Sequence, residues 1–169
     1  EKVWVVDPLD GTKEFIEGIP NFVVSIGLVK QGVPVIGILY NPVTKELFAA
    51  SKGKGAFLNT KRIWCRSKEK TEEMKILNSR SETRRGLWDS YKDKFKILEP
   101  VGSVAYKLGL TAAAKADVFA SLRPYQWGAE KRNSILWFDD NFVGTELDPE
   151  LSYAKVADAC GLKGVAVKT

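Results

Sequence analysis

The N-terminal third of the chain alternates short apolar runs with pairs of turn-forming residues. Each run is rich in β-branched or aromatic side chains, a composition typical of strands. The connections between runs, such as Gln31-Gly32, are as short as hairpin loops. Residues 3–6 are long enough for a buried strand, and residues 21–30 are apolar nearly throughout, as in a strand buried on both faces. We therefore predict an antiparallel meander of strands at residues 3–6, 21–30, 33–40, 46–50 and 56–58.

Beyond residue 60 the pattern becomes more mixed. Residues 61–85 carry nine basic and four acidic side chains, so we predict that most of this segment is a solvated connection. Ser103 is a favourable helix N-cap residue, and Val104, Leu108 and Ala112 then fall on one face of a helix. The remaining predictions from the pattern are a helix at residues 82–91 and strands at residues 95–98 and 117–122.

This order of elements predicts an α/β fold, an α+β layered sandwich. Its sheet is expected to be mixed and largely antiparallel, with flanking helices, because a meander of strands is followed by alternating strands and helices. The chain starts inside the first predicted strand and without an initiator Met, so we expect the fold to be N-terminally truncated. The 169 residues are sufficient to bury a hydrophobic core.

Composition narrows the class of protein and of chemistry. With 44% hydrophobic and 28% charged residues the chain is typical of soluble globular proteins, and no apolar run is long enough to span a membrane. Cys65 and Cys160 lie far apart, which favours two free thiols in a reducing, cytoplasmic compartment over a disulfide. Histidine is absent, which excludes a Ser-His-Asp triad, His-ligated zinc and a His general base. Acid–base chemistry then falls to carboxylates, hydroxyls or metal-bound water.

The net charge of +5 is distributed unevenly along the chain. Residues 1–124 hold 21 basic and 14 acidic side chains, a net charge of +7, whereas residues 125–169 hold 5 basic and 7 acidic ones, a net charge of −2. A basic N-terminal part suits a small anionic phosphate substrate, although a lysine-rich solvated surface explains most of these side chains equally well. We expect neither a nucleic acid nor a membrane as a partner.

Two carboxylates flank the turn after the first predicted strand, in the sequence DPLDGT. Asp7 closes the strand, a proline fixes φ for a tight turn, and Asp10 follows three residues after Asp7. Carboxylate and carbonyl oxygens are the ligands that Mg²⁺ prefers, so Asp7, Asp10 and the Leu9 carbonyl could form part of its coordination shell. The backbone amides of Gly11 and Thr12 would point outward at the start of a helix, where they could bind phosphate.

The nine residues DPLDGTKEF resemble the first signature motif of the inositol-monophosphatase-like, lithium-sensitive, Mg²⁺-dependent phosphatases. The continuation TKEF is most similar to the 3'(2'),5'-bisphosphate nucleotidase branch, whereas a lone DxxD would indicate only an ordinary Asp-Pro turn. The resemblance implies hydrolysis of a phosphomonoester by water that two or more Mg²⁺ ions activate. It assigns Asp7, Leu9 and Asp10 to the metal, Asp10 and Thr12 to catalysis, and the Gly11 and Thr12 amides to the phosphate. Thr12 would orient or deprotonate the water.

Further positions within residues 1–124 resemble the same family. Residues 75–81, KILNSRS, are similar to its strand and turn beside the substrate, which implies that Ser79 and Arg80 contact phosphate. Ser103 and Lys107 could reach a second phosphate or a ribose, although a capping Ser and a surface Lys are the simpler interpretations.

Acidic residues elsewhere are not expected to complete the metal site. The resemblance implies further acidic ligands upstream of the first motif, and these would precede Glu1. Glu14 and Glu17 lie past the motif and are expected on a solvated helix face. The family's second motif adds a Trp-Asp pair, but here Gly128 follows Trp127, and glycine has no side chain to coordinate a metal.

The C-terminal part resembles a different family. Residues 126–169, beginning QWGAEKRN, are similar to the C-terminal part of thiamine-diphosphate-dependent acetyltransferases of the sulfoacetaldehyde type. No GDG motif precedes them, so the coenzyme site is not implied. We predict two domains, residues 1–124 and 125–169, with a helix at 149–159 and a strand at 164–167. The change near residue 124 is compatible with a fusion, with an assembly artefact or with a divergent phosphatase C-terminus. We favour a junction between segments of two different origins.

Three functions are therefore compatible with the sequence. The favoured one is a Mg²⁺-dependent phosphatase fragment acting on 3'-phosphoadenosine 5'-phosphate or, alternatively, on an inositol monophosphate. The others are a remnant of a thiamine-diphosphate-dependent acetyltransferase and an anion- or metal-binding fragment without catalysis. The apolar side chains of Trp137, Phe138 and Phe142 make self-association through the C-terminal segment an expectation.

Overall fold

The structure is a computed structural model that describes residues 1–65 and 68–122. The chain divides into two units, Glu1–Ser121 and Leu122–Thr169, and the description concerns the first. The features predicted for the C-terminal segment, namely Gly128, Cys160, the apolar aromatic residues, the helix and the strand, lie outside the described residues. No helix within the described ranges is long and apolar enough to cross a membrane.

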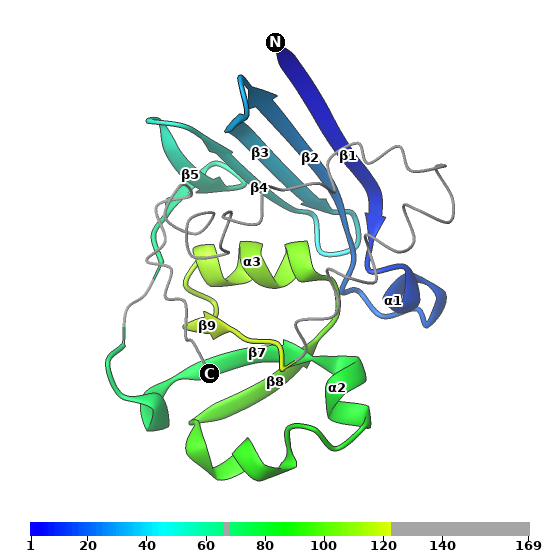
Figure 1. Cartoon of the computed structure of the whole chain (residues 1–169), viewed down its shortest axis with the longest axis vertical. Helices are drawn as coiled ribbons and strands as arrows, with labels where there is room; N and C mark the ends of the chain where they lie inside the picture. Colours follow the sequence, from blue (N-terminus) through cyan, green and yellow to red (C-terminus); the bar gives the residue numbers. More distant parts are fainter. Residues whose placement is uncertain (66–67, 123–169) are drawn as a thin grey trace. The chain divides into compact units, whose positions relative to one another are not determined.

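Six strands form one antiparallel sheet in which each strand pairs with the next along the chain (Figure 1). The antiparallel meander predicted from the apolar runs and short turns is therefore confirmed. The sixth strand lies where the sequence predicts a solvated connection, and it follows a tight hairpin in which Asn59 takes a positive φ of 55°. The strands are β1 (Lys2–Asp10), β2 (Val23–Lys30), β3 (Val33–Asn41), β4 (Glu46–Ser51), β5 (Gly55–Leu58) and β6 (Lys61–Ile63).

A second sheet has three parallel strands in the order β8-β7-β9. Parallel neighbours require crossover connections, and these contain the helices that follow β7 and β8. The predicted α/β fold, with a mixed and largely antiparallel set of strands and flanking helices, is confirmed. The remaining elements are α1 (Thr12–Ile16), η1 (Thr71–Glu73), β7 (Lys75–Ser79), α2 (Arg80–Arg84), η2 (Asp89–Lys94), β8 (Ile97–Val101), α3 (Val104–Ala112) and β9 (Val118–Phe119).

Helix α3 lies at the centre of the hydrophobic core. It contacts β1, β2 and β3 of the antiparallel sheet and β9 of the parallel one, and Figure 1 shows it between the two sheets. Gly109 allows this close packing, because a Cβ there would lie 3.1 Å from the Phe48 ring and 3.2 Å from Leu39. The buried cluster around the helix consists of Val23, Phe48, Leu77, Val101, Tyr106, Leu110 and Ala116.

Tyr106 adds a polar contact to this core. Its hydroxyl donates to the Glu46 carboxylate at 2.6 Å, and Lys115 pairs with the same carboxylate. Burial, together with the hydrogen bond to Glu46, raises the pKa of Tyr106 to about 12. The phenol therefore remains a protonated donor at neutral pH and ties α3 to β4.

The burial predicted for the first two strands is wrong. The apolar side chains of residues 3–6 on β1 are exposed, with Trp4 59% exposed, and β2 is half-buried beyond Val23. β1 is the edge strand of its sheet, and within the described residues no layer covers either face of its first half. Apolar composition identifies a strand, but burial depends on the layers that cover its faces.

Several boundaries after β6 also differ from the predictions. α2 begins at Arg80, so the predicted turn is the first turn of a helix. The helix predicted at residues 82–91 is interrupted, because Gly86 takes a φ of 72° and ends α2. The strand predicted at residues 95–98 begins only at Ile97, and the strand predicted at residues 117–122 is shorter.

The face predicted for helix α3 is wrong as well. Leu108 is exposed, whereas Tyr106, Lys107, Gly109 and Leu110 are buried. The reason is that α3 contacts both sheets and so buries two sides, while a single apolar stripe describes a helix packed on one side.

Candidate active site

A β-bulge brings Asp7 and Asp10 to the same face of strand β1. On a regular strand, residues three apart point to opposite faces. In the pairing with β2, Asp7 lies opposite Ser25 and Asp10 lies opposite Val23, so β1 advances three residues while β2 advances two. Ser25 and Val23 are two residues apart and so lie on the same face of β2. Because the bulge places Asp7 and Asp10 opposite them, both aspartates fall on that face as well. The two predicted metal ligands are thus presented on one side of the sheet.

Strand β1 runs on to Asp10, so the prediction that Asp7 closes the strand before a tight turn is wrong. The end of β1 is fixed by its own hydrogen bonds and by Gly11. Asp7 Oδ1 accepts from the Leu9 amide at 3.0 Å, and Thr12 Oγ1 donates to the Leu9 carbonyl at 3.1 Å. Gly11 has a φ of 100°, and a Cβ there would lie 2.7 Å from the Asn21 carbonyl oxygen. Only glycine fits this position without rearrangement. Helix α1 starts directly after it, and the first amides of a helix have no acceptor within the helix.

Asp10 is tied to the start of helix α3. Its Oδ2 accepts from Ser103 Oγ at 2.5 Å and from the Ala105 amide at 2.7 Å. Ser103 Oγ itself accepts from the Tyr106 amide at 2.9 Å, so the predicted N-cap is confirmed. The Ser103 hydroxyl already has partners on both sides, and a substrate contact by Ser103 stays a prediction.

The oxygen atoms of the β1–α1 turn fit a hard cation in part. Asp7 and Asp10 each have one carboxylate oxygen that receives no hydrogen bond from the described residues. With the Leu9 carbonyl they match the oxygen ligands of Mg²⁺, but they are fewer than an octahedral shell needs. Within residues 1–65 and 68–122, no group of three or more His, Cys, Asp or Glu side chains could hold a metal ion. The remaining ligands would be water, phosphate or residues beyond these ranges.

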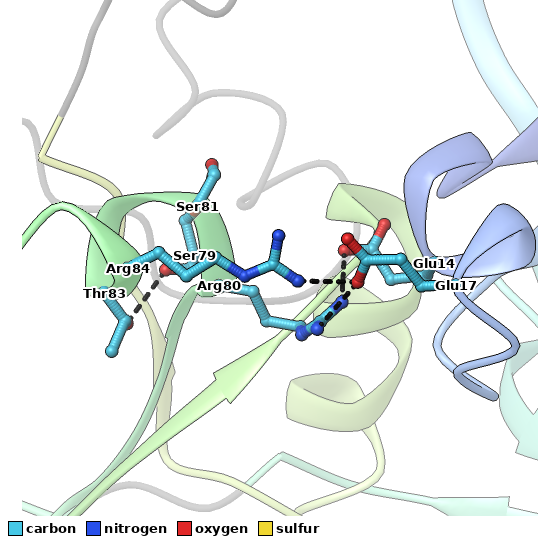
Figure 2. Close-up of polar contacts among 7 residues, drawn as sticks. All are labelled: Glu14, Glu17, Ser79, Arg80, Ser81, Thr83 and Arg84. Atoms are coloured by element: carbon cyan, nitrogen blue, oxygen red, sulfur yellow. Dashed lines mark hydrogen bonds and ion pairs between the residues drawn. The ribbon is translucent and has the colours of Figure 1, made fainter.

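The two arginines of helix α2 point toward Glu14 in helix α1 and Glu17 directly after it (Figure 2). Arg80 donates to Glu14 at 3.0 Å and to Glu17 at 2.9 Å, and Arg84 donates to Glu17 at 2.6 Å. The hydrogen bonds from Arg84 and then Arg80 lower the pKa of Glu17 to about 2. Arg80 is thus engaged by two carboxylates, and its predicted contact with phosphate stays a prediction.

Glu14 is a residue of this region whose environment the sequence analysis missed. It is only 9% exposed rather than on a solvated helix face. Its carboxyl group lies against Gly102, where a Cβ would be 2.1 Å from the carboxyl carbon, so only glycine leaves room for it. The sequence did contain a signal for this ion pair. Glu14 is an acidic residue shortly after DGT, and the basic residue Arg80 lies in the second segment that the resemblance assigns to the same site.

Ser79 is buried at the end of strand β7. Its Oγ lies 3.0 Å from Ser81 Oγ, and its carbonyl accepts from Thr83 Oγ1 at 3.0 Å (Figure 2). These contacts are local to the connection between β7 and α2. A phosphate contact by Ser79 stays a prediction.

Lys107 is buried in helix α3, so its interpretation as a surface lysine is wrong. It is 3% exposed, and its Nζ lies 4.6 Å from the centroid of the Phe119 ring. Burial lowers the pKa of its ammonium group, against the attraction of Glu82, Asp10 and Glu14. A buried cation therefore lies among carboxylates near the predicted metal ligand, and its contact with a substrate phosphate stays a prediction.

Glu82 is a second buried acid that the sequence analysis did not single out. Its carboxylate accepts from Trp88 Nε1 at 2.9 Å and from Ser121 Oγ at 2.8 Å. It therefore ties helix α2 to the residues that follow strand β9.

Comparison with known proteins adds to this geometry. The family described as the inositol monophosphatase family matches residues 1–128. Inositol monophosphatase 3 of Solanum lycopersicum is 38% identical over 131 residues, which are 72% of this chain and 48% of that protein. The crystal structure of the extragenic suppressor protein suhB from Bartonella henselae superposes with a TM-score of 0.64 at 34% identity, over 72% of this chain and 50% of that one. The chain thus spans about half the length of these relatives.

A separate match concerns a short segment. The probable sulfoacetaldehyde acetyltransferase of Rhizobium meliloti is 79% identical over 47 residues, which are 28% of this chain and 8% of that enzyme. The resemblance to the inositol monophosphatase family is therefore confirmed, whereas the similarity to the acetyltransferase is limited to this short segment. The bisphosphate nucleotidase branch stays a prediction.

Proposed function

Because the chain belongs to the inositol monophosphatase family, we propose that its β1–α1 turn is part of a Mg²⁺-dependent centre that hydrolyses a small phosphomonoester. The observation that carries this proposal is the pair Asp7 and Asp10, brought to one face of β1 by the bulge directly before Gly11. Carboxylates for a hard cation beside backbone amides for an anion form an arrangement suited to phosphoryl chemistry.

Each residue of the turn has a proposed role. Asp7, Asp10 and the Leu9 carbonyl would hold the cation, and the amides of Gly11 and Thr12 would hold phosphate oxygens. The Thr12 hydroxyl, which contacts the Leu9 carbonyl, would orient the attacking water. Bound Mg²⁺ supplies stabilisation of negative charge on the phosphate and lowers the pKa of bound water.

For the substrate we propose 3'-phosphoadenosine 5'-phosphate, with an inositol monophosphate as the alternative. The TKEF continuation of the motif supports a substrate with a second phosphate. The relatives named inositol monophosphatase support the alternative. Ser79, Arg80 and Ser103 are candidate contacts for either.

We do not propose an acetyltransferase activity for this chain. The matching segment is 8% of the acetyltransferase, and the chain contains no GDG motif. A role in binding an anion or metal without catalysis differs from the phosphatase only in turnover, which an assay of phosphate release measures.

The proposed metal site is tested by calorimetric titration of the whole chain with Mg²⁺ and Mn²⁺. We expect weak binding, because the turn supplies only part of an octahedral shell, and loss of binding in the Asp7→Asn, Asp10→Asn double variant. The Asp89→Asn, Asp93→Asn variant makes the same change of charge away from the turn and should bind normally. Unchanged binding in the Asp7, Asp10 variant would remove the metal assignment.

A further inference from the structure

We propose that Ser103 is a positioning residue that holds the Asp10 carboxylate in one orientation, with Oδ1 turned toward the metal site. That this orientation serves to bind a metal ion rests on the proposed function. The orientation itself follows from contacts between strand β1 and helix α3. It differs from the predicted role of Ser103 as a substrate contact.

The backbone at Ser103 adopts a conformation that side chains rarely take. Its φ is 52° and its ψ is 122°, and strain of this kind persists where the surroundings impose it. The preceding residue, Gly102, has no room for a side chain because the Glu14 carboxyl group fills the space. The chain therefore passes Glu14 at Gly102 and places a serine at the strained position that follows.

The hydrogen bonds of the Ser103 hydroxyl fix the direction of its single proton. The Tyr106 amide can only donate, so Ser103 Oγ accepts from it at 2.9 Å. The hydroxyl proton is then free to point to Asp10 Oδ2, which lies at 2.5 Å. A hydrogen bond to a carboxylate is among the stronger kinds, and Ser103 is buried from competing water.

A second donor acts on the same oxygen of Asp10. The Ala105 amide donates to Oδ2 at 2.7 Å, so two donors from the start of α3 converge on one atom. Oδ1 receives no hydrogen bond from the described part of the chain. The carboxylate is therefore anchored through Oδ2, and Oδ1 is the oxygen presented for coordination. Groups that orient a metal ligand in this way typically change metal affinity by about 10–100-fold when removed.

The Ser103→Gly variant separates this role from the capping of helix α3. Glycine suits the strained backbone and is an acceptable N-cap residue, so the temperature of unfolding should change little. The affinity for Mn²⁺, measured by calorimetry on the whole chain, should fall about 10-fold or more. Ser103→Ala should lose the same affinity with a larger drop in unfolding temperature, because alanine keeps the strain.

Tyr106→Phe is the matched control. It removes another hydroxyl of α3 that donates to a carboxylate, that of Glu46, away from Asp10. We expect a lower unfolding temperature and unchanged Mn²⁺ affinity. Mn²⁺ affinity in Ser103→Gly equal to that of the wild type, or an equal loss in Tyr106→Phe, would overturn the proposal.

Amide hydrogen exchange tests the orientation without any metal. In Ser103→Gly the Ala105 amide should exchange about 10-fold faster or more, because Asp10 no longer stays in place to accept from it. The Lys107 amide, which donates to the Ser103 carbonyl at 3.3 Å, reports fraying of the helix and should be unchanged. An unchanged rate at Ala105 would overturn the positioning role. Absence of Mn²⁺ binding by the wild type would instead overturn the proposed metal site and leave this result standing.

Discussion

Two arginine partners lower the pKa of the Glu17 carboxyl group, although this side chain is accessible to solvent. Arg84 and Arg80 both donate to its carboxylate, and these hydrogen bonds lower its pKa from 4.5 to about 2. The pKa in the folded state is thus lower than in an unfolded chain. The ion pairs therefore contribute stability above about pH 4.5, and this contribution is lost as the pH falls toward 2.

The Glu17→Gln variant should remove this pH dependence. We expect the free energy of unfolding of the wild type to exceed that of the variant at neutral pH. The difference should shrink toward zero as the pH falls from about 4.5 to about 2, because Glu17 is then protonated in the wild type as well. Urea unfolding at a series of pH values measures the difference. Glu69→Gln, an exposed glutamate outside the cluster, is the control, and a difference that stays constant with pH would contradict the prediction.

The separation of residues along the chain decides which parts of the site the sequence predicts. Asp7, Asp10 and Gly11 lie within five residues at the end of β1, so their spacing alone indicates an oxygen-rich site beside free amides. The contact between Asp10 and Ser103 joins residues 93 apart. No local pattern contains such a pair. The sequence therefore predicts ligands in a turn but not the groups that hold them in place.

At the scale of secondary structure, strand β1 contrasts with the opposite edge of its sheet. β6 is three residues long and carries the exposed charges of Lys61 and Arg62, features that protect an edge from pairing with another chain. β1 is nine residues long, and its exposed positions include Trp4 and Val6. We therefore expect this exposed, apolar edge to promote self-association.

The sequence predicted the strands of this sheet well but not their exposure. Alternation and turn residues are local, so β2 to β5 appear where they were expected. Exposure depends on which layers cover each face, and that is a property of the assembled fold. The same reasoning explains α3, whose two buried sides reflect two sheets rather than one apolar stripe.

The Trp4→Lys variant should reduce self-association of the chain. A charge on the edge strand opposes strand pairing, and it removes the largest exposed apolar side chain of β1. We expect the wild type to form concentration-dependent oligomers in analytical ultracentrifugation and the variant to remain smaller at the same concentration.

Trp64→Lys provides the matched control, because Trp64 is also exposed but lies after β6. It should leave the distribution of oligomers unchanged. Equal effects of the two variants would show that hydrophobicity in general, rather than the β1 edge, drives association. Association that persists in both would favour the C-terminal segment as its source.

At the scale of the whole molecule, the candidate site depends on elements from both sheets. Asp10 on β1 contacts Ser103 at the start of α3, and Glu14 on α1 contacts Arg80 on α2. Assembly of the two sheets around α3 therefore places the turn, whereas the ligands themselves come from β1. In the described part of the chain only a partial metal shell results.

This partial shell leads to a prediction for turnover by the 169 residues alone. A two-metal phosphatase needs its cations, water and phosphate held in one arrangement, and loss of groups that act together is not additive. We therefore expect weak, Mg²⁺-dependent binding of 3'-phosphoadenosine 5'-phosphate but phosphate release barely above background. Release is measured from this substrate and from inositol 1-phosphate, with and without lithium, and Asp10→Asn sets the background. Robust, lithium-inhibited release by the wild type would contradict the prediction and would locate the remaining ligands outside the described residues. The preferred substrate in that case would decide between the bisphosphate nucleotide and the inositol phosphate.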